Sequence, residues 1–365
     1  MELKCGIVGL PNVGKSTLFN ALTQTSAAQA ANYPFCTIEP NLGKVDVPDS
    51  RLDKIAKIGQ SEKIIPTQIE FVDIAGLVKG ASKGEGLGNQ FLSHIRQVDA
   101  IVHVVRCFDD SNIVHVESEI NPVKDIEIIE YELIIADIDS LEKRLPNLEK
   151  KAKQSKELQG EVELINQLLV IMKTGKPATT MLNADNHLQI KNLQLITSKP
   201  RLYALNVGES DLQNNGNSYT TDVMSYLKGQ SVECVIISAQ IESEISGLES
   251  DAEKKEFLED LGLNETGLAK LIKAAYKLLG LATYFTVGPK EARAWTISVG
   301  MSAPQAAGEI HTDFEKGFIR AETMSYNDYI EFNGEQGAKS AGKLRLEGKE
   351  YIVNDGDIMH FRFNT

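Results

Sequence analysis

One eight-residue stretch near the start of the chain constrains its fold more than any other. Residues Gly9–Ser16 read GLPNVGKS and match the G-x-x-x-x-G-K-[S/T] pattern of a phosphate-binding loop. The apolar, β-branched run Leu3–Val8 before them predicts a buried strand, and Thr17–Leu22 after them predicts the start of a helix. Strand, glycine loop and helix follow in the order that a P-loop requires. The stretch therefore predicts an α/β protein with a doubly wound sheet that binds a nucleoside triphosphate.

The residue types of this loop suit phosphate chemistry. Glycine lets backbone N–H groups close around anionic oxygens, and the N-terminus of the following helix adds a favourable dipole. Lys15 is expected to reach the β- and γ-phosphates, and Ser16 to offer its hydroxyl to Mg²⁺. Nucleotide contacts are accordingly expected at six consecutive positions, namely Asn12, Val13, Gly14, Lys15, Ser16 and Thr17.

Two later segments occupy the places of the switch regions of P-loop GTPase-like proteins. The irregular stretch Asn32–Asn41 contains Thr37, our candidate for the threonine that closes onto Mg²⁺. A predicted strand from Gln68 ends in the D-x-x-G pattern, in which Asp73 would hold the magnesium shell and the Gly76 N–H would meet the γ-phosphate. The glycine-rich residues that follow are expected to form the second switch.

The position after Gly76, where many GTPases place a glutamine to orient the attacking water, is Leu77. Leucine cannot hydrogen-bond water, so either hydrolysis is very slow or another residue or a partner supplies the polar group. His115 is the candidate, because it follows the predicted strand Ala100–Val105 and so lies near the carboxyl edge of the sheet, where ligands bind in such folds. A structural histidine is the alternative interpretation of this residue.

The base-binding part of the site is expected after the predicted strand Arg201–Val207. The stretch Asn206–Glu209 takes the place of the guanine-reading N-K-x-D motif, but valine replaces the lysine and glutamate replaces the aspartate. A carboxylate such as that of Glu209 would leave the acceptor N1 of adenine unsatisfied. If the base is adenine, Asn206 and backbone groups are therefore the groups expected to read it. The residues expected to surround the base are Leu205, Asn206, Val207, Ser238 and Ala239.

From Asp125 the sequence becomes charged and helical. Pro146 lies within the first of two predicted helices and is expected to kink it. Apolar residues recur at a/d spacing, which predicts a coiled-coil hairpin of two antiparallel helices. They are Ile134, Ile138, Leu141, Leu145 and Leu148 in the first helix and Val162, Ile165, Leu169 and Met172 in the second.

The net charge of −13 argues against bulk attraction to nucleic acid, so DNA is not an expected partner. Two local clusters of cations could still meet RNA phosphates. These are Lys150, Lys151, Lys153 and Lys156 at the hairpin tip, and Lys339, Lys343, Arg345 and Lys349 in the tail. Four scattered cysteines without a C-x-x-C pair suit a reducing, cytoplasmic setting, and no apolar run is long enough to suggest a membrane partner.

On these residues the chain resembles the Obg-like ATPases of the YchF type. The likeness rests on the phosphate-binding loop, the Asn32–Asn41 stretch, the glycine-rich segment after Gly76 and the N-x-x-E sequence at Asn206, and it spans the whole chain. The resemblance implies an ATPase that prefers ATP, uses Mg²⁺, allows K⁺, and binds the ribosome through large-subunit RNA and proteins. It also implies that His115 matches the histidine proposed to assist hydrolysis.

The resemblance further implies three parts. Residues 1–127 and 199–281 would form the P-loop nucleotide-binding domain, residues 128–198 the helical coiled-coil insertion, and residues 282–365 a TGS domain, a ubiquitin-like β-grasp module. The tail itself predicts strands at Ala294–Val299 and Glu350–Val353. Two other functions stay open: a GTPase of the same fold, and a non-catalytic, nucleotide-gated adaptor in which Leu77 makes hydrolysis vestigial.

Overall fold

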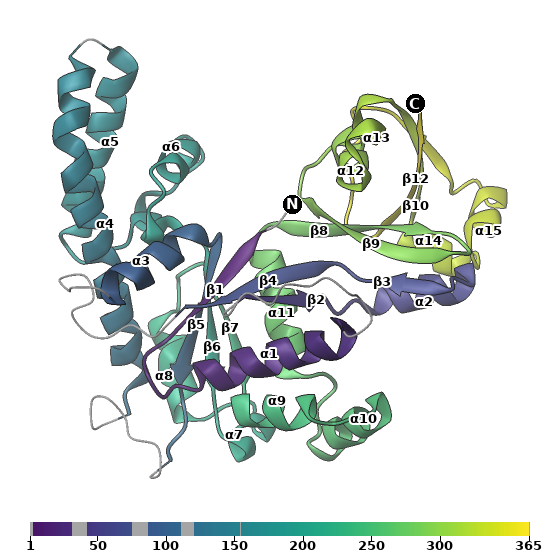
Figure 1. The fold of residues 1–365 in the computed structure, drawn as a ribbon, viewed down its shortest axis with the longest axis horizontal. Helices are drawn as coiled ribbons and strands as arrows, with labels where there is room; N and C mark the ends of the chain where they lie inside the picture. The colour runs from purple at the N-terminus through teal and green to yellow at the C-terminus, as the bar shows by residue number, and fades with distance from the viewer. Residues whose placement is uncertain (1–2, 31–41, 75–86, 111–119, 154, 365) are drawn as a thin grey trace. The chain divides into compact units, whose positions relative to one another are not determined.

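The computed structural model describes residues 3–30, 42–74, 87–110, 120–153 and 155–364 (Figure 1). The chain divides into two compact units. We call them the P-loop unit, made of Lys4–Gly43 and Phe71–Leu271, and the C-terminal unit, made of Met1–Leu3, Lys44–Glu70 and Ile272–Thr365. No helix in the described ranges is long and apolar enough to cross a membrane.

The first sheet has the strand order β2-β4-β1-β5-β6-β7, of which β1, β5, β6 and β7 lie in the P-loop unit. Its strands are β1 (Lys4–Val8), β2 (Leu42–Asp46), β4 (Gln68–Asp73), β5 (Ala100–Arg106), β6 (Arg201–Asn206) and β7 (Glu233–Ile237). Neighbouring pairs from β1 to β7 run parallel. Every residue of β5 is buried, as expected for a strand that is covered on both faces. The parallel pairing and the non-sequential strand order confirm the predicted doubly wound sheet.

Several helices precede, connect or follow these strands. They are α1 (Lys15–Ala30), α3 (Leu87–Gln97), α7 (Glu209–Gln213), α8 (Ser218–Tyr226), α9 (Ala239–Ser246), α10 (Asp251–Asp260) and α11 (Gly267–Leu278). In one buried cluster, Tyr203 and Leu205 of β6 pack with Val223 of α8 and Ile241 of α9. The helix that follows the phosphate-binding loop, α1, packs against α9. Helices α8 and α9 thereby pack with β6 in one cluster, and α9 also contacts α1.

The charged middle of the P-loop unit forms a helical hairpin. Helix α4 (Pro122–Ala152) continues through Pro146, and α5 (Lys156–Met172) follows it. The side chains of Asn121 and Ser155 accept hydrogen bonds from the first turns of α4 and α5, which caps the start of each helix. The two helices pack against each other, as the sequence predicts.

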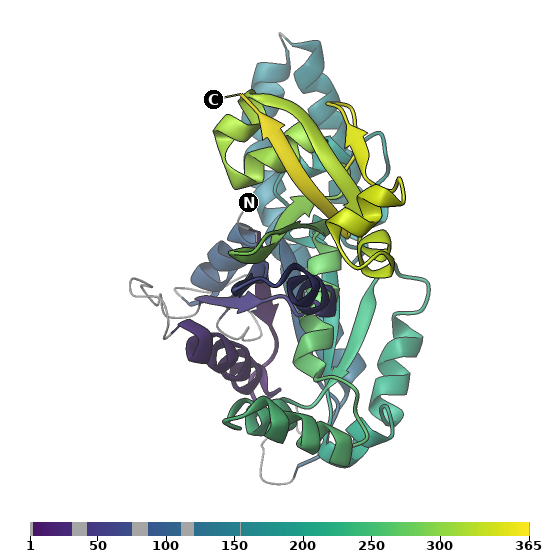
Figure 2. The same ribbon diagram turned by 90° about the vertical axis from the view of Figure 1, so that its right-hand side faces the viewer.

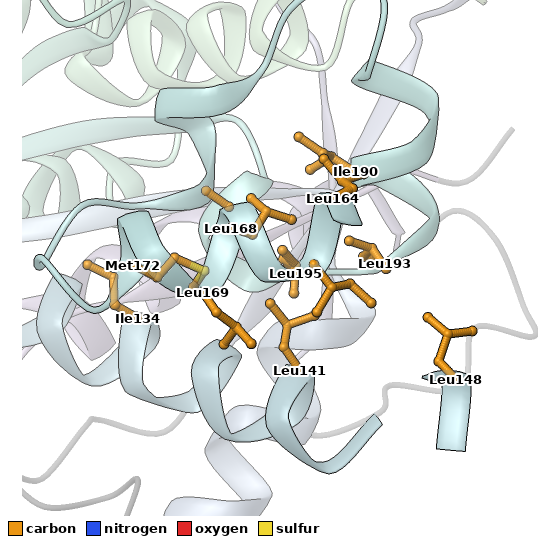
Figure 3. Packing of buried hydrophobic residues seen from close by; sticks show 12 residues of the cluster. Ile134, Leu141, Leu148, Leu164, Leu168, Leu169, Met172, Ile190, Leu193 and Leu195 are labelled. Carbon is orange, nitrogen blue, oxygen red and sulfur yellow. The ribbon is translucent and has the colours of Figure 1, made fainter. Parts of the chain in front are cut away.

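The predicted apolar stripe is the core of this hairpin (Figure 3). Its buried members are Ile134, Leu141 and Leu148 of α4 and Ile165, Leu169 and Met172 of α5, with Ile138, Leu145 and Val162 half-buried against them. Ile190 of the short helix α6 (His187–Asn192) completes the cluster together with Leu193 and Leu195. The stripe is therefore intramolecular core, which confirms the predicted hairpin of two helices.

Buried Asp137 fixes α4 to the chain that returns to the sheet. Its carboxylate accepts hydrogen bonds from the backbone N–H groups of Ile196 and Thr197 at 3.0 and 2.8 Å, and from Thr197 Oγ1 at 2.9 Å. These bonds offset the cost of burying a carboxylate. The base of the hairpin is thus anchored just before β6 begins.

The C-terminal unit contains a mixed sheet with the order β11-β10-β12-β8-β9-β3. Its strands are β3 (Lys63–Ile65), β8 (Leu281–Val287), β9 (Glu291–Ser298), β10 (Phe318–Ser325), β11 (Arg345–Glu347) and β12 (Asp357–Phe363). Strand β9 confirms the strand predicted at Ala294–Val299. On one face α12 (Ala303–Ile310) and α13 (Thr312–Lys316) pack, and on the other α2 (Ser50–Gly59), α14 (Tyr326–Glu331) and α15 (Glu335–Ser340).

A segment from the first fifth of the chain belongs to this unit. Leu52 and Ile55 of α2 are buried in a cluster with Phe285 of β8, and β3 pairs in parallel with β9. The Arg51 guanidinium donates to Asp49 of its own segment at 2.7 Å and to Asp355 at 2.6 Å. These contacts join residues that are far apart in the sequence.

The strand predicted at Glu350–Val353 is wrong. These residues make only an isolated bridge, between Ile352 and Ser302. The local reason is that their backbone bonds to the start of α12 and to the loop before it. The Tyr351 carbonyl accepts from the Ala303 N–H at 2.8 Å, and the Val353 N–H donates to the Met301 carbonyl at 3.0 Å. The Tyr351 hydroxyl also donates to Asp357 at 2.7 Å, which holds the segment across the start of β12.

Candidate functional site

The phosphate-binding loop has the backbone that its glycines require. Asn12 and Gly14 adopt positive φ values of 62° and 91°, a region that glycine enters without strain. A Cβ atom on Gly14 would lie 2.2 Å from the Asn206 Nδ2 atom, and one on Gly9 would lie 2.8 Å from the Val104 carbonyl oxygen. The loop therefore passes too close to its neighbours for any side chain at these two positions.

The first residue of α1 and the last residue of β4 meet in an ion pair. Lys15 Nζ contacts Asp73 Oδ1, and the two side chains are only 10% and 16% exposed. The pair brings together the predicted phosphate-binding cation and the predicted magnesium ligand. Ser16 and Thr17 lie beside Lys15 in the first turn of α1. The structure thus places these groups together beside the phosphate-binding loop.

Asn206 links three parts of the site. Its Nδ2 donates to the Val13 carbonyl at 2.8 Å, and its Oδ1 accepts from the Ala239 N–H at 2.9 Å. The side chain is buried, with 4% of the residue exposed. Asn206 therefore ties the phosphate-binding loop to the start of α9, where Ser238 and Ala239 are expected to lie beside the base.

The other predicted base-site residues fall into two groups. Leu205, Val207, Ser238 and Ala239 are buried, and Val207 belongs to the hydrophobic cluster of the sheet. Glu209 is exposed at the first position of α7, next to the helix N-cap Gly208. The described residues thus place an exposed carboxylate at the end of the N-x-x-E stretch, whereas Asn206 and Val207 at its start are buried.

Three of the four residues predicted to act in hydrolysis, Thr37, Gly76 and His115, lie outside the described residues, as does Leu77. Lys15 is the fourth; it is the first residue of α1 and contacts Asp73. The assignment of roles to Thr37, Gly76 and His115 therefore stays a prediction from the sequence and the resemblance.

Sequence reasoning missed Arg106, the last residue of β5. Its side chain is buried, with 1% of the residue exposed, and lies over the Phe108 ring at 4.6 Å. Its guanidinium donates to the carbonyls of Phe108 at 3.2 Å and Asp110 at 3.3 Å. Arg106 also pairs with Asn206 across the β5–β6 ladder. A cation at the carboxyl end of an apolar strand is the sequence signal that could have identified it.

Sequence reasoning also missed Glu242, which lies one turn into α9. Its carboxylate accepts from the Gly267 N–H at 2.7 Å, at the start of α11. Burial raises the pKa of Glu242 to about 7, and the bonds from α11 and the nearby Lys270 only partly oppose this. The group next to the base-site loop therefore titrates near neutral pH.

The oxygen donors beside the phosphate-binding loop fit a magnesium ion that takes most of its ligands from phosphates and water. Ser16 offers a hydroxyl and Asp73 a carboxylate, which are hard ligands of the kind Mg²⁺ prefers. Within the described ranges no group of three or more His, Cys, Asp or Glu residues could hold a metal ion by itself. This donor set suits a substrate-bridged ion better than an all-protein metal centre.

Two family models match parts of the chain. A model for the C-terminal part of YchF-type GTPases, described as a protein of unknown function, matches residues 281–364. A model described as a 50S ribosome-binding GTPase matches residues 4–171. A GTP-binding protein from Pyrococcus horikoshii OT3 shares the fold, with a TM-score of 0.57 and 20% identity over 100% of both chains.

Curated relatives match the chain from end to end. It is 55% identical over 368 residues to the ribosome-binding ATPase YchF of Bacillus subtilis, and 54% identical over 367 residues to the protein of that name from Escherichia coli O157:H7. Both alignments cover 100% of this chain and 100% of the relative. The solved structure of the Schizosaccharomyces pombe YchF GTPase has a TM-score of 0.89 and 39% identity, covering 99% of this chain and 98% of that one.

Proposed function

The chain belongs to the YchF family, and on that premise we propose that it is an ATPase that binds the ribosome. The single observation that supports the nucleotide part most strongly is the Lys15–Asp73 pair beside the phosphate-binding loop. The ribosome part is supported by the names of the curated relatives. A ribosome partner implies a cytoplasmic location.

Triphosphate binding changes the partner of Lys15. The loop N–H groups and the α1 N-terminus bind the phosphate oxygens, and Lys15 moves from Asp73 to the β- and γ-phosphates. Asp73, once released, would hold Mg²⁺ together with Ser16 and Thr37. The chemistry that Mg²⁺ supplies there is to offset the negative charge that develops on the transferred phosphoryl group. The proposal allows K⁺ as a further ion at this site.

Hydrolysis needs a polar group to orient the attacking water, because Leu77 cannot do so. We assign this task to His115, and we assign the γ-phosphate contact to the Gly76 N–H. Arg106 donates hydrogen bonds to the carbonyls of Phe108 and Asp110. These bonds fix the first residues after β5, from which the chain continues to His115.

ATP is the proposed substrate because of the groups around the base. The Asn206 amide holds Val13 and Ala239, and the following residues lack the lysine and aspartate of a guanine site. The second candidate is a GTPase, which is favoured by the GTPase names of the matching N-terminal family model and of the Schizosaccharomyces pombe relative. Competition of ATP and GTP against a fluorescent nucleotide separates the two: displacement by GTP at equal or lower concentration would restore the GTPase.

The proposed arrangement keeps the three parts implied by the resemblance, namely residues 1–127 with 199–281, 128–198, and 282–365. The hairpin tip carries the cations that suit ribosomal RNA. Residues 143–156 contain six lysines or arginines and one acidic residue. This local excess contrasts with the net charge of −13 for the whole chain.

Single-turnover hydrolysis of ATP with and without ribosomes tests the proposal. An ATPase that acts on the ribosome should hydrolyse ATP slowly alone and faster when ribosomes are present. ATP-dependent cosedimentation with ribosomes without any hydrolysis would identify a nucleotide-gated adaptor instead. Failure to bind ribosomes in any nucleotide state would contradict the ribosome part of the proposal and leave the ATPase part standing.

A further inference from the structure

The C-terminal unit contains a pocket of about 420 Å³ at one end of its sheet, which we call the C-terminal pocket. Ser325, the last residue of β10, pairs with Asp357, the first residue of β12, and both line it. Arg51 of α2 and Arg345 of β11 line it as well. Figure 2 shows this end of the sheet, with α14 beside β10 and β12. Sites for small molecules typically enclose about 300–1,000 Å³, so the pocket is large enough for a metabolite.

Backbone hydrogen bonds hold the turn that forms one side of the C-terminal pocket. The Gly356 N–H donates to the Thr283 carbonyl at 2.7 Å, and the Gly356 carbonyl accepts from the Tyr326 N–H at 3.1 Å. The Thr283 N–H donates in turn to Asp355 Oδ1 at 2.8 Å. The turn is thus tied to β8 and to the start of α14. A site held in this way loses little conformational entropy when it binds a ligand.

Two arginine–aspartate pairs line the pocket, and they differ. Arg51 Nη1 donates to Asp355 Oδ2 at 2.6 Å, which is a full hydrogen bond. Arg345 Nη2 lies 3.7 Å from Asp357 Oδ1, which is beyond hydrogen-bond distance. The second pair is therefore an ion pair without a hydrogen bond, and both of its groups keep hydrogen-bonding capacity.

Asp357 presents a buried acceptor that is only half used. Its side chain is 4% exposed, and its Oδ2 accepts from the Tyr351 hydroxyl at 2.7 Å and from the Asn354 N–H at 2.9 Å. Its Oδ1 accepts no hydrogen bond from any residue that the structure describes. Burial raises the pKa of Asp357, and the bonds from Asn354 and Tyr351 and the charge of Arg345 only partly oppose this. A cationic donor at Oδ1 would therefore offset part of the cost of burying this carboxylate.

Arg345 has a donor to spare beside this acceptor. Its Nε donates to Glu347 at 2.9 Å, and its Nη2 donates to the Tyr351 hydroxyl at 3.0 Å. Its Nη1 makes no hydrogen bond within the described part of the chain. An unused cationic donor thus lies beside the unused anionic acceptor of Asp357. The α-carboxylate and α-ammonium of a free amino acid are an acceptor and a donor on neighbouring atoms, so they complement this pair.

The carboxylates around the pocket outnumber its arginines. Each arginine forms ion pairs with two carboxylates, which are Asp49 and Asp355 for Arg51, and Glu347 and Asp357 for Arg345. Two positive charges thus meet four negative charges, so the pocket favours a ligand that brings further positive charge. Asp355 is accessible to such a charge, because its side chain is 52% exposed although it is paired.

From this geometry we infer that the C-terminal pocket binds a free basic amino acid of the lysine or arginine type. Arg345 Nη1 donates to the α-carboxylate, the α-ammonium donates to Asp357 Oδ1, and the cationic side chain of the ligand lies against Asp355. Each charged group of the ligand has a partner, which distinguishes it from a diamine, a neutral amino acid or a lysine within a protein. All lining residues belong to the C-terminal unit, so the inference does not depend on the proposed ATP or ribosome binding.

The first test is a ligand series on the full-length chain, measured by isothermal titration calorimetry. L-lysine or L-arginine should bind with a dissociation constant below about 1 mM. Each of three lysine analogues lacks one charged group. Cadaverine lacks the carboxylate, ε-aminocaproic acid lacks the α-ammonium, and L-norleucine lacks the side-chain ammonium. We expect each analogue to bind at least about tenfold more weakly than lysine, because each leaves one charged contact unmade.

The second test uses variants of the lining residues. Arg345→Gln should weaken lysine binding about tenfold and leave cadaverine binding no weaker, because cadaverine has no carboxylate to lose. A merely structural role of Arg345 would weaken both ligands. Arg320→Gln is the matched control, because it removes the same charge from an exposed position of β10 outside the pocket, and it should bind lysine like the unchanged chain. Asp355→Asn should reduce the difference in affinity between lysine and norleucine. Unchanged fluorescence of Trp295, which lies in the C-terminal unit, would establish that the variants are folded.

Four results would overturn the inference. No heat of binding with lysine or arginine at millimolar concentration would remove the site. Cadaverine affinity equal to or higher than that of lysine would identify a diamine as the ligand. Lysine blocked at both ends, as the Nα-acetyl methyl amide, would identify a lysine side chain of a protein if it bound as tightly as free lysine. Equal losses in Arg345→Gln and Arg320→Gln would assign the effect to net charge. The ligand series uses the unchanged chain, so it decides the matter even if a variant fails to fold.

Discussion

Asn206→Ala is the sharpest test of how the nucleotide site is built. The substitution removes the donor to the Val13 carbonyl and the acceptor for the Ala239 N–H, two bonds of 2.8 and 2.9 Å. Val13 and Ala239 are buried, with 1% and 3% exposed, so water cannot easily replace the lost partners. A buried polar group left without its partner costs about 1–3 kcal/mol. We therefore expect the free energy of unfolding of the P-loop unit to fall by about 2–6 kcal/mol.

The same change should weaken ATP binding by about tenfold or more, about 1.4 kcal/mol, because the phosphate-binding loop and the α9 loop lose their common anchor. Urea unfolding followed by far-UV circular dichroism and calorimetric titration with ATP measure the two effects. Tryptophan fluorescence is unsuitable, because the one tryptophan, Trp295, lies in the C-terminal unit.

Asn206→Asp separates the two bonds, because it keeps the acceptor for Ala239 but puts a carboxylate oxygen opposite the Val13 carbonyl. It also places a charge in a buried site, so it should be at least as destabilised as Asn206→Ala. The reasoning is refuted if Asn206→Ala unfolds at the wild-type urea concentration and binds ATP with unchanged affinity.

The site and the hairpin give rise to four further predictions. Lys15→Ala should abolish tight triphosphate binding in a calorimetric titration, since Lys15 is the cation of the loop; unchanged affinity would remove the P-loop assignment. His115→Ala should lower single-turnover hydrolysis with nearly unchanged ATP affinity, and a wild-type rate would return His115 to a structural role. Because burial raises the pKa of Glu242 from 4.5 to about 7, its contribution to stability is fully present below pH 4.5 and is lost as the pH rises through 7. Urea unfolding across this range should show a fall of about 3 kcal/mol that is absent from Glu242→Gln, and parallel pH profiles would contradict the assignment. Replacing Lys150, Lys151, Lys153 and Lys156 by glutamine should flatten the salt dependence of ribosome cosedimentation by about one unit for each phosphate that these lysines bind; an unchanged slope would mean that the hairpin tip does not bind RNA.

The parts of the fold that depend on local patterns could be predicted from the sequence. The phosphate-binding loop is specified within eight residues, and separate roles are expected of Lys15 and Asp73 from their motifs, but their ion pair is known only from the structure, in which β1 and β4 are adjacent. The a/d stripe likewise predicts which faces of α4 and α5 are buried, because that periodicity is a property of each helix alone.

The parts that depend on long-range packing could not be predicted in this way. No local sequence pattern predicts that Ile55 packs in one cluster with Phe285. None predicts that the Asn206 side chain hydrogen-bonds to the backbone of Val13 and Ala239. The wrong strand at Glu350–Val353 has the same origin: β-branched and aromatic residues favour a strand, and backbone bonds to the loop before α12 override that preference. Thr37, Gly76 and His115 lie outside the described residues, so their roles rest on the sequence.

The membership of Lys44–Glu70 in the C-terminal unit affects how this chain can be dissected and synthesised. A shortened version that stops at residue 281 would keep α2 but lose Phe285 and Ile358, so the apolar side of Leu52 and Ile55 would face water. Such a deletion exposes hydrophobic surface and also removes the C-terminal sheet. A loss of activity would therefore not separate these two effects. The same connectivity imposes an order on biosynthesis, because α2 and β3 leave the ribosome early and cannot pack until β8, β9 and β12 have been made.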